Sequence, residues 1–252
     1  METPVSCPRL LDHRRLWALK PVLARVYEPW FDALLAAVPQ GGRALEVGAG
    51  PGFLAEHARR RRPDVRWTAM DVLETPWNDL VGDALRLPIR GGSANAVVGL
   101  DLVHHLARPA PFFQEAARVL APGGRVAVVE PWVTPLSYPV YRYLHQEGCH
   151  LGLDPWNPFG VGEHGAKDAF DGDAAVVWRL VGTTPAARWH ELGFAPPRAR
   201  RLNSFAYLLS LGFKEASLLP LPLVPTLQAL DTWLAPASPV FGMRAFVTWD
   251  RL

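Results

Sequence analysis

The chain has 252 residues, and 49% of them are hydrophobic, which is enough to bury the core of one large domain. A formal net charge of +2, with Arg59–Arg62 as the only basic run, argues against a nucleic-acid partner. Two cysteines cannot form a disulfide framework, and the first 20 residues lack the apolar region of a signal peptide. No apolar stretch approaches the roughly 20 residues of a membrane span. We therefore expect a cytoplasmic protein without a membrane span.

Two helices are expected before the first strand. Ser6 and Pro8 are typical of a helix start, as cap and first-turn residue, and Pro21 should end this helix. A second helix is predicted over about 22–38, bent near Pro29. Its apolar face consists of Tyr27, Trp30, Phe31, Leu34 and Leu35. We expect these helices to cover a ligand site or one face of a sheet.

The next stretch joins a strand to a helix through alternate glycines. Ala44–Val47 is a short apolar run typical of a buried strand, and residues 53–62 have the pattern of a helix. Between them lie Gly48, Gly50 and Gly52. Glycine permits positive φ and lets a ligand approach bare backbone, and the helix directs its first N–H groups at that ligand. Strand, glycine turn and helix predict the start of a nucleotide-type α/β domain.

The spacing of the glycines narrows the ligand class. A dinucleotide fingerprint needs a third glycine where Phe53 stands, and a phosphate-binding P-loop needs a lysine that is missing. What remains is Glu46-x-Gly48-x-Gly50-x-Gly52. This pattern resembles motif I of the class I S-adenosylmethionine (SAM)-dependent methyltransferases; the alternative is an ordinary glycine turn before a helix.

Further strands and helices alternate downstream. Strands are expected at 65–70, near 79–82, at 96–100 and at 125–130, with a helix at about 110–120 and a tight turn at 121–124. This alternation implies a mostly parallel sheet with helices on both faces and a ligand at the carboxyl ends of the strands. The predicted fold is a doubly wound seven-stranded α/β sheet of the class I methyltransferase type.

Several later segments extend the resemblance, in the family's order, over roughly residues 40–132. Asp71 ends the second strand, Gly82-Asp83-Ala84 precedes Leu85, Gly99–Leu106 follows the fourth strand, and Leu120–Arg125 precedes the fifth. The short segment between Asp71 and Asp83 departs from the family because it leaves little room for a helix.

The resemblance implies SAM as the cofactor and assigns its contacts. The glycine loop and the following helix suit the methionine carboxylate, Glu46 and Asp101 the ammonium side, Asp71 the ribose hydroxyls, and Asp83 the adenine amino group. The implied cofactor-binding residues are Glu46, Gly48, Ala49, Gly50, Gly52, Asp71, Val72, Asp83, Ala84 and Asp101.

Each acid has a structural alternative. Glu46 could pair with Arg43, Asp71 could cap the next turn, Asp83 could be a plain turn residue, and Asp101 could cap a short helix that follows it. His104 and His105 stand in a segment whose counterpart in the family looks structural, and they are the weaker candidates for a catalytic base.

The pattern of alternation ends after the fifth strand. Residues 132–182 are rich in Pro, Gly, Asp and aromatic residues, and we interpret them as an insertion over the site that contains one helix near 138–146. A helix over 184–192 capped by Thr184, a strand within 198–209, a helix at 224–234 and a last strand at 244–249 complete the prediction. The chain is thus divided into an N-terminal cover (1–40), a SAM-binding core (41–131), the insertion and a C-terminal part of the sheet (183–252).

The insertion supplies candidate catalytic residues. His145, His150 and His164 could accept a proton from a bound acceptor, although packing or surface positions are the default for histidines. Metal-ligand types are present around Cys149, but their spacing fits no closed zinc pattern, so no metal site is predicted. Aromatic residues could line an acceptor pocket or form the insertion's own small core: Trp132, Tyr138, Tyr141, Trp156 and Phe159.

The sequence therefore predicts a SAM-dependent methyltransferase acting on a small, partly apolar acceptor, with oxygen or carbon favoured as the methylated atom because the motif of many amino-group methyltransferases is absent. The alternatives are a SAM-binding scaffold or partner subunit without turnover, a nicotinamide-dependent oxidoreductase, and a nucleic-acid methyltransferase. The oligomeric state cannot be predicted from the sequence.

Overall fold

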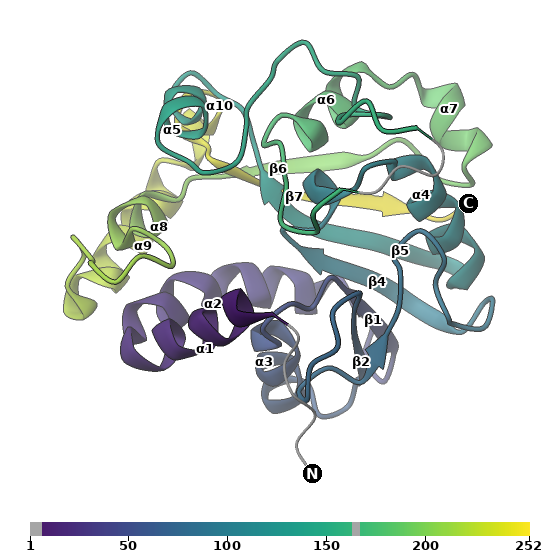
Figure 1. Cartoon of the computed structure of the whole chain (residues 1–252), viewed down its shortest axis with the longest axis horizontal. Helices are drawn as coiled ribbons and strands as arrows, with labels where there is room; N and C mark the ends of the chain where they lie inside the picture. Colours follow the sequence, from purple (N-terminus) through teal and green to yellow (C-terminus); the bar gives the residue numbers. More distant parts are fainter. Residues whose placement is uncertain (1–6, 163–166) are drawn as a thin grey trace.

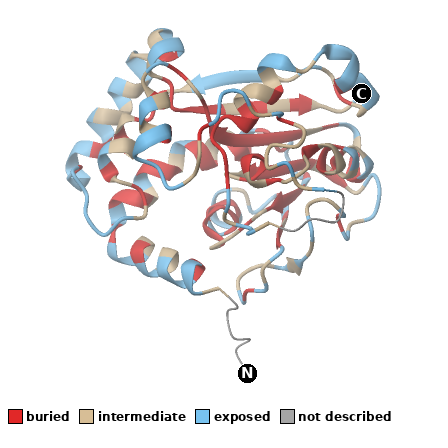
Figure 2. Ribbon diagram, turned by 45° about the horizontal axis from the view of Figure 1, so that its top comes forward, coloured by how far each residue is buried: buried red, intermediate tan, exposed pale blue. Residues whose placement is uncertain are grey.

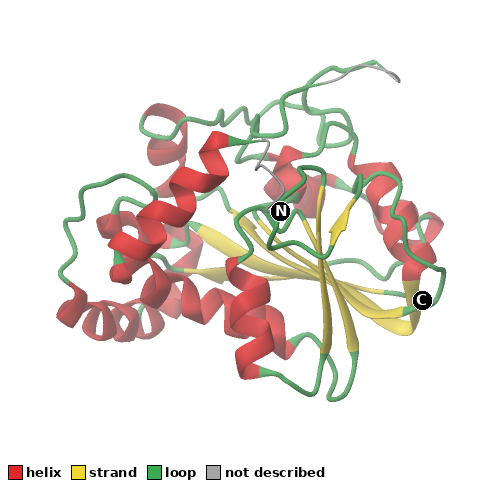
Figure 3. Cartoon of the chain, turned by 60° about the horizontal axis from the view of Figure 1, so that its bottom comes forward, coloured by secondary structure: helices red, strands yellow, loops and turns green. Residues whose placement is uncertain are grey.

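A seven-stranded sheet runs through the centre of the molecule, with helices on both faces (Figures 1 and 3). The structure is a computed structural model that describes residues 7–162 and 167–252. The strand order is β3-β2-β1-β4-β5-β7-β6, and β7 is antiparallel to both of its neighbours while the remaining pairs are parallel. This confirms the predicted fold class. The strands are β1 (Arg43–Val47), β2 (Arg66–Asp71), β3 (Leu80–Val81), β4 (Ala94–Leu100), β5 (Leu120–Pro131), β6 (Arg198–Leu202) and β7 (Arg244–Asp250).

The helices form two layers and a C-terminal group. One layer, formed by α1, α2 and α3, covers one face of the sheet, and α4, α6 and α7 cover the other face (Figure 1). The C-terminal helices α8 and α9 lie beside α2. The helices are α1 (Pro8–Leu19), α2 (Pro21–Ala36), α3 (Phe53–Arg61), η1 (Val103–His105), α4 (Pro109–Val119), α5 (Ser137–Tyr143), α6 (Val176–Thr183), α7 (Ala186–Glu191), α8 (Phe205–Ser210), η2 (Leu221–Leu223), α9 (Val224–Trp233), η3 (Ala235–Ala237) and α10 (Ser238–Phe241).

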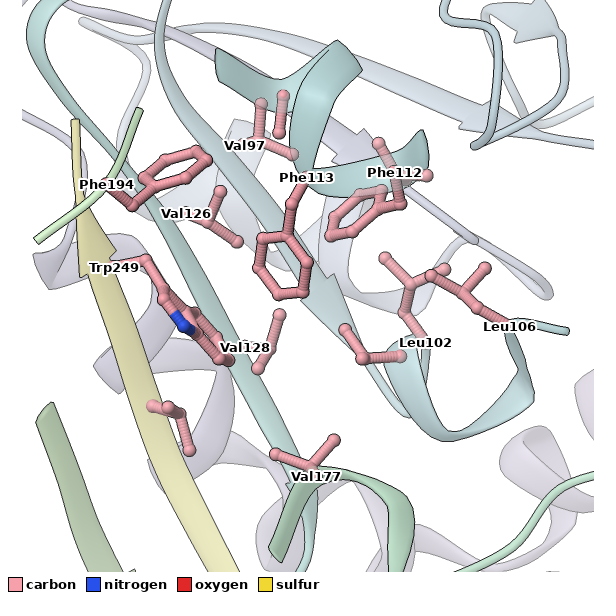
Figure 4. Packing of buried hydrophobic residues seen from close by; sticks show 14 of the residues in the cluster. Val97, Leu102, Leu106, Phe112, Phe113, Val126, Val128, Val177, Phe194 and Trp249 are labelled. Atoms are coloured by element: carbon pink, nitrogen blue, oxygen red, sulfur yellow. The ribbon is translucent and has the colours of Figure 1, made fainter. Parts of the chain in front are cut away.

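The strands divide the interior into two apolar layers because successive side chains of a strand point to opposite faces. In β1, Leu45 and Val47 belong to the core under α4, whereas Ala44 joins the core under α2 and α3. Figure 2 shows the central strands as the most buried part of the molecule. On the α4 face the core is aromatic: the ring centroid of Phe113 lies 5.0 Å from those of Trp189 and Trp249. Figure 4 shows Phe113 beside Trp249 and Phe194 in this core.

The N-terminal helices have the predicted starts and apolar face. Pro8 is the first residue of α1 and Pro21 the first of α2, while Ser6 lies outside the described residues. The five apolar residues predicted for the second helix are all buried, and α2 contacts the sheet. α1 lies farther out, and its Trp17 stacks on Phe53 of α3 at 4.0 Å. These helices therefore cover one face of the sheet.

In the second half, one helix was missed and one helix start is wrong. Helix α6 was not predicted, although its Val176, Val177 and Leu180 are fully buried at helical spacing. Thr184 does not cap α7; it is the extended residue after α6, and Pro185 precedes α7. The predicted strand within 198–209 is confirmed as β6, and the residues after Asn203 and Ser204 form α8.

Among the described residues, no helix is both long and apolar enough to cross a membrane.

Candidate functional site

The glycine loop connects β1 to α3 with left-handed backbone at each of its three glycines. The φ angles are +69° at Gly48, +49° at Gly50 and +80° at Gly52. A Cβ at Gly48 would lie 2.9 Å from Leu102 Cδ1, and one at Gly52 would lie 2.6 Å from Trp77 Cδ1. At Gly50 the only neighbour is Leu10 Cδ2 at 3.8 Å. Glycine is thus required at the first and last positions for packing, while Gly50 faces open space.

Asp71 fastens the end of β2 to this loop. Its Oδ2 accepts a hydrogen bond from Gly50 N–H at 2.7 Å, and its Oδ1 accepts one from Leu73 N–H at 2.9 Å. The second bond is the turn-capping alternative raised from the sequence. Each carboxylate oxygen keeps a further lone pair, so the same side chain can still accept hydrogen bonds from hydroxyls. Val72, next in the chain, is 56% exposed and offers an apolar surface beside the carboxylate.

Two side chains of the β2–β3 connection lie on the glycine loop, and sequence reasoning missed both. Trp77 Nε1–H and Asn78 Nδ2–H donate to the Gly50 carbonyl at 2.7 and 3.2 Å. Arg14 of α1 donates to the Pro51 carbonyl at 2.7 Å and lies 4.7 Å from the Trp77 ring. The connection has no helix, as the short spacing predicted, and its aromatic side chain packs against the loop instead.

Asp83 and Ala84 follow β3 at the same edge of the sheet. Asp83 is exposed, and its Oδ1 accepts a hydrogen bond from Leu85 N–H at 2.8 Å. This is the turn geometry considered as the alternative. The second carboxylate oxygen remains available to a ligand, and Ala84 is half-buried beside it.

Glu46 lies inside the sheet layer and does not pair with Arg43. Its Oε2 accepts a hydrogen bond from Trp67 Nε1–H at 2.6 Å, and the residue is 3% exposed. Within the described part of the chain, no cation lies within salt-bridge distance of it. Burial raises the pKa of Glu46 to about 8 despite the hydrogen bond from Trp67.

We expect Glu46→Gln to make the protein more stable than the wild type at alkaline pH. The native carboxyl keeps its proton up to about pH 8, whereas the unfolded carboxyl loses it near pH 4.5, so the wild type loses stability as the pH rises between these values. Glutamine retains an oxygen for Trp67 and has no proton to lose. Urea unfolding should show equal stabilities near pH 5 and a variant about 3 kcal/mol more stable at pH 9. A constant difference across this range would contradict the raised pKa.

Asp101 forms an ion pair and does not cap η1. It adopts φ +54°, and its carboxylate pairs with Arg244 of β7, with 3.1 Å between Oδ2 and Nη1. The guanidinium of Arg244 also lies 4.3 Å from the Trp30 ring. Burial raises the pKa of Asp101 to about 6, even though Arg244 acts to lower it. Glu130 Oε1 accepts hydrogen bonds from the N–H groups of Leu102 and Val103, where η1 begins.

The side chain of His104, a residue of η1, lies between two carboxylates. Its Nδ1 lies 2.5 Å from Glu130 Oε2 and its Nε2 lies 3.1 Å from Glu147 Oε2. Burial alone would lower the pKa of His104, but Glu130 and Glu147 raise it to about 10. Burial would likewise raise the pKa of Glu147, and His104 lowers it to about 2. Because His104 is buried and both of its ring nitrogens contact carboxylates, it is not free to accept a proton from a substrate, the role that the sequence already disfavoured.

A hollow of about 370 Å³ opens between α1 and the insertion. Its apolar wall includes Phe159 and Phe170, and Arg9 lies 4.6 Å over the Phe170 ring. Helix α1 contacts both the hollow and the glycine loop: Arg9 lines the hollow, and Leu10 Cδ2 lies 3.8 Å from a Cβ built at Gly50. The lining residues are Arg9, Gln146, Glu147, Gly148, His150, Pro158, Phe159, Phe170, Asp171, Gly172 and Asp173.

One of the three predicted catalytic histidines faces this hollow with a carboxylate partner. His150 is 62% exposed at its side chain, and its Nδ1 lies 2.5 Å from Oδ2 of Asp173, which is buried. His145 accepts a hydrogen bond from Glu147 N–H at 3.3 Å and packs its ring edge against Tyr141. His164 lies outside the described residues. Sequence reasoning missed Asp173, because its contact with His150 spans 23 positions.

The aromatic residues proposed for an acceptor pocket belong mostly to the core. Trp132 and Trp156 pack in the core under α4, and Tyr141 is buried with Tyr138 at its edge in a small cluster of the insertion. Phe159 alone of the five lines the hollow. The alternative of a small core within the insertion is therefore correct for Tyr138 and Tyr141, whereas Trp132 and Trp156 pack in the main core.

Three comparisons relate this geometry to known proteins. Residues 45–128 match a family model described as a methyltransferase domain. The chain is 27% identical over 168 residues, 63% of its length, to the tRNA (carboxymethyluridine(34)-5-O)-methyltransferase of Mus musculus, of which the match covers 24%. It is 28% identical over 123 residues to the ubiquinone/menaquinone biosynthesis C-methyltransferase of Dinoroseobacter shibae, covering 42% of this chain and 49% of that one.

Among solved structures, a chain from the complex of the Haloferax volcanii Trm112 methyltransferase activator with a methyltransferase superposes with a TM-score of 0.53. The superposition covers 95% of this chain and 93% of the other, at 16% sequence identity, so the likeness concerns the fold. The matched region spans about a quarter of the first curated relative and about half of the second.

Proposed function

We propose that this chain, a class I SAM-dependent methyltransferase by its fold and its family match, transfers the methyl group of SAM to an oxygen of a small, partly apolar acceptor. The observation that supports the proposal is the hollow between α1 and the insertion, because the same helix α1 also contacts the glycine loop. The loop follows the carboxyl end of β1, and Gly172 of the hollow contacts His104 and His105, which follow the carboxyl end of β4, the edge where ligands of such sheets bind.

The residues of the loop fit the cofactor. Gly50 leaves open space in front of the loop, and the N-terminus of α3 suits the carboxylate of the methionine part. Asp71 retains lone pairs for the ribose hydroxyls. The buried carboxyl of Glu46 has no cationic partner among the described residues, and the ammonium group of SAM would provide one. The cofactor brings a methyl group already activated by its sulfonium, so the protein has to position the acceptor and exclude water.

The hollow has the character of a small-molecule site. Its volume lies at the lower end of the range of about 300–1,000 Å³ typical of ligand pockets. Phe159 and Phe170 offer apolar contact, while the rest of the lining is largely polar and includes the charged groups of Arg9 and Glu147. An acceptor with an apolar part and several polar groups matches this lining.

His150 is the residue that would take the proton of a hydroxyl acceptor. A carboxylate only accepts hydrogen bonds, so Asp173 requires the proton of His150 on Nδ1 and leaves Nε2 as the basic nitrogen. Nε2 lies 3.3 Å from Arg142 Nη1, at an exposed position on the wall of the hollow. Asp173 thus holds His150 in the one tautomer in which Nε2 can act as a base.

The test of the function is release of S-adenosylhomocysteine from SAM in the presence of graded acceptors. Phenolic and quinol compounds with a hydroxyl should support turnover, and isosteres without the hydroxyl should not. Total tRNA belongs in the same panel because one relative acts on tRNA. Turnover with tRNA alone would overturn the small-molecule acceptor, and SAM binding without turnover on any acceptor would favour the non-catalytic scaffold.

We expect His150→Ala to lower kcat with the best hydroxyl acceptor by about 10²-fold, the contribution of a positioned base. The affinity for SAM should not change, because His150 lies on the acceptor side of the loop. Asp173→Asn should give a smaller loss, and His190→Ala, at an exposed position of α7, should give none. Full turnover by His150→Ala would remove the base from the mechanism.

A further inference from the structure

Three side chains converge at the inner wall of the hollow. His104 Nε2 lies 3.1 Å from Glu147 Oε2, and His105 Nε2 lies 3.8 Å from Glu147 Oε1. All three donor atoms lie within 4.8 Å of one another. We propose that His104, His105 and Glu147 bind a divalent transition-metal ion, which goes beyond the methyltransferase function proposed above.

The separations match those that a bound ion would require. Two ligand atoms about 2.0–2.1 Å from a tetrahedral zinc ion lie roughly 3.3 Å apart. The observed 3.1 Å joins His104 Nε2 to one oxygen of Glu147 and the 3.8 Å joins His105 Nε2 to the other, so movement of the Glu147 carboxylate would complete the site. In the metal-free protein, the hydrogen bond between His104 and Glu147 holds these groups together, and a bound ion would replace the proton that His104 donates there.

Each histidine is already oriented for ligation by a hydrogen bond on its other ring nitrogen. Nδ1 of His104 contacts the carboxylate of Glu130, and Nδ1 of His105 lies 2.8 Å from the Asp171 carbonyl. A carbonyl accepts only, so His105 carries its proton on Nδ1 and presents a lone pair on Nε2. Histidine ligands of metals are held in this way, with a carboxylate or a carbonyl behind the ring.

The backbone of Gly172 packs closely against the three side chains. A Cβ at Gly172 would lie 2.8 Å from His104 Cδ2, 2.9 Å from Glu147 Oε2 and 2.9 Å from His105 Cε1. Any larger residue would therefore press into the cluster. Glycine at this position lets the insertion close over the site while the ligand atoms keep their positions.

The donor set selects the kind of ion. Two imidazoles and one carboxylate suit Zn²⁺, Fe²⁺ or Co²⁺, whereas Mg²⁺ and Ca²⁺ prefer oxygen ligands alone. Three protein ligands leave at least one position open, and Glu147 lines the hollow. An ion there would bind an oxygen of the acceptor and lower its pKa. This use rests on the proposed function, but binding of the ion does not.

Zinc titration of the full chain after treatment with a chelator tests the site. Calorimetry should give one equivalent of Zn²⁺ bound, and Co²⁺ in its place should show visible d–d absorption with nitrogen ligands. His105→Ala and Glu147→Gln should each lower the affinity by about 100-fold or more, since loss of an outer partner alone costs 10–100-fold. His190→Ala, an exposed histidine on α7, is the matched control and should bind like the wild type.

Two results would overturn the proposal: wild-type protein that binds Zn²⁺ with a Kd of about 1 mM or weaker, or tight binding that both variants retain. Circular dichroism of the metal-free variants establishes that they are folded, and Glu147→Gln preserves the shape of the side chain. If Zn²⁺ binds and methyl transfer is indifferent to the chelator, the site stands and its role toward the acceptor is wrong. If no acceptor is methylated, the metal content still decides the proposal.

Discussion

Gly50→Arg should abolish SAM binding while the sheet remains folded. Gly50 is the loop residue that faces open space, with its nearest neighbour, Leu10 Cδ2, 3.8 Å from a Cβ built there. An arginine side chain would fill the space in front of the loop that the cofactor requires, and φ of +49° would add strain. We expect the affinity measured by calorimetry to fall by at least about 10³-fold, or roughly 4 kcal/mol.

The matched control is the same substitution at Gly92. This glycine also has positive φ, +67°, and a Cβ there has no neighbour within 4 Å. It lies before the start of β4, whereas the glycine loop follows the end of β1, and the two strands are parallel. Gly92→Arg therefore carries the same charge and the same kind of strain at the opposite edge of the sheet, and it should bind SAM normally. Equal binding by both variants would contradict the position of the cofactor in front of Gly50.

The sequence allowed prediction of those features that depend on residues close together in the chain. The glycine loop, Asp71 at the end of β2 and the alternating strands depend on local conformation and on the period of the apolar pattern. The same signals missed α6, which is short and lies in the insertion, where the alternation of strands and helices has ended. The predicted limits from β1 to α4 lie within two residues of those observed, whereas β5 begins at Leu120, within the segment predicted as a helix end and turn.

The chemistry of the site depends on contacts that no local pattern records. Asp101 meets Arg244 across 143 positions, and His104 meets Glu147 across 43. The spacing of His145, His150 and Cys149 fitted no zinc pattern, and the cluster that we propose to bind a metal uses residues from two separate segments. Only the fold brings the segment after β4 against the insertion, so the spacing of residues within the insertion could not record this cluster.

A buried lysine fixes the corner between α1 and α2. The Nζ of Lys20 donates to the carbonyls of Ser210, Gly212, Lys214 and Ala216, with distances of 2.6–2.8 Å. An ammonium has three N–H groups, so four acceptors share them. The residue is 7% exposed. This contact joins the N-terminal helices to the segment after α8.

We expect Lys20→Met to lower the free energy of unfolding by about 3 kcal/mol or more, because hydrogen bonds from a charged group contribute about 1.5–3 kcal/mol each and buried carbonyls would lose their donor. Urea unfolding measures the loss. Lys214→Met, an exposed lysine in the contacted segment, should change stability by less than about 0.5 kcal/mol. The same corner supports α1, whose His13 stacks on Phe213 at 4.4 Å and whose Leu10 stands before Gly50. Lys20→Met should therefore also weaken SAM binding at temperatures where it is still folded, and unchanged stability and affinity would show that packing alone holds α1 over the loop.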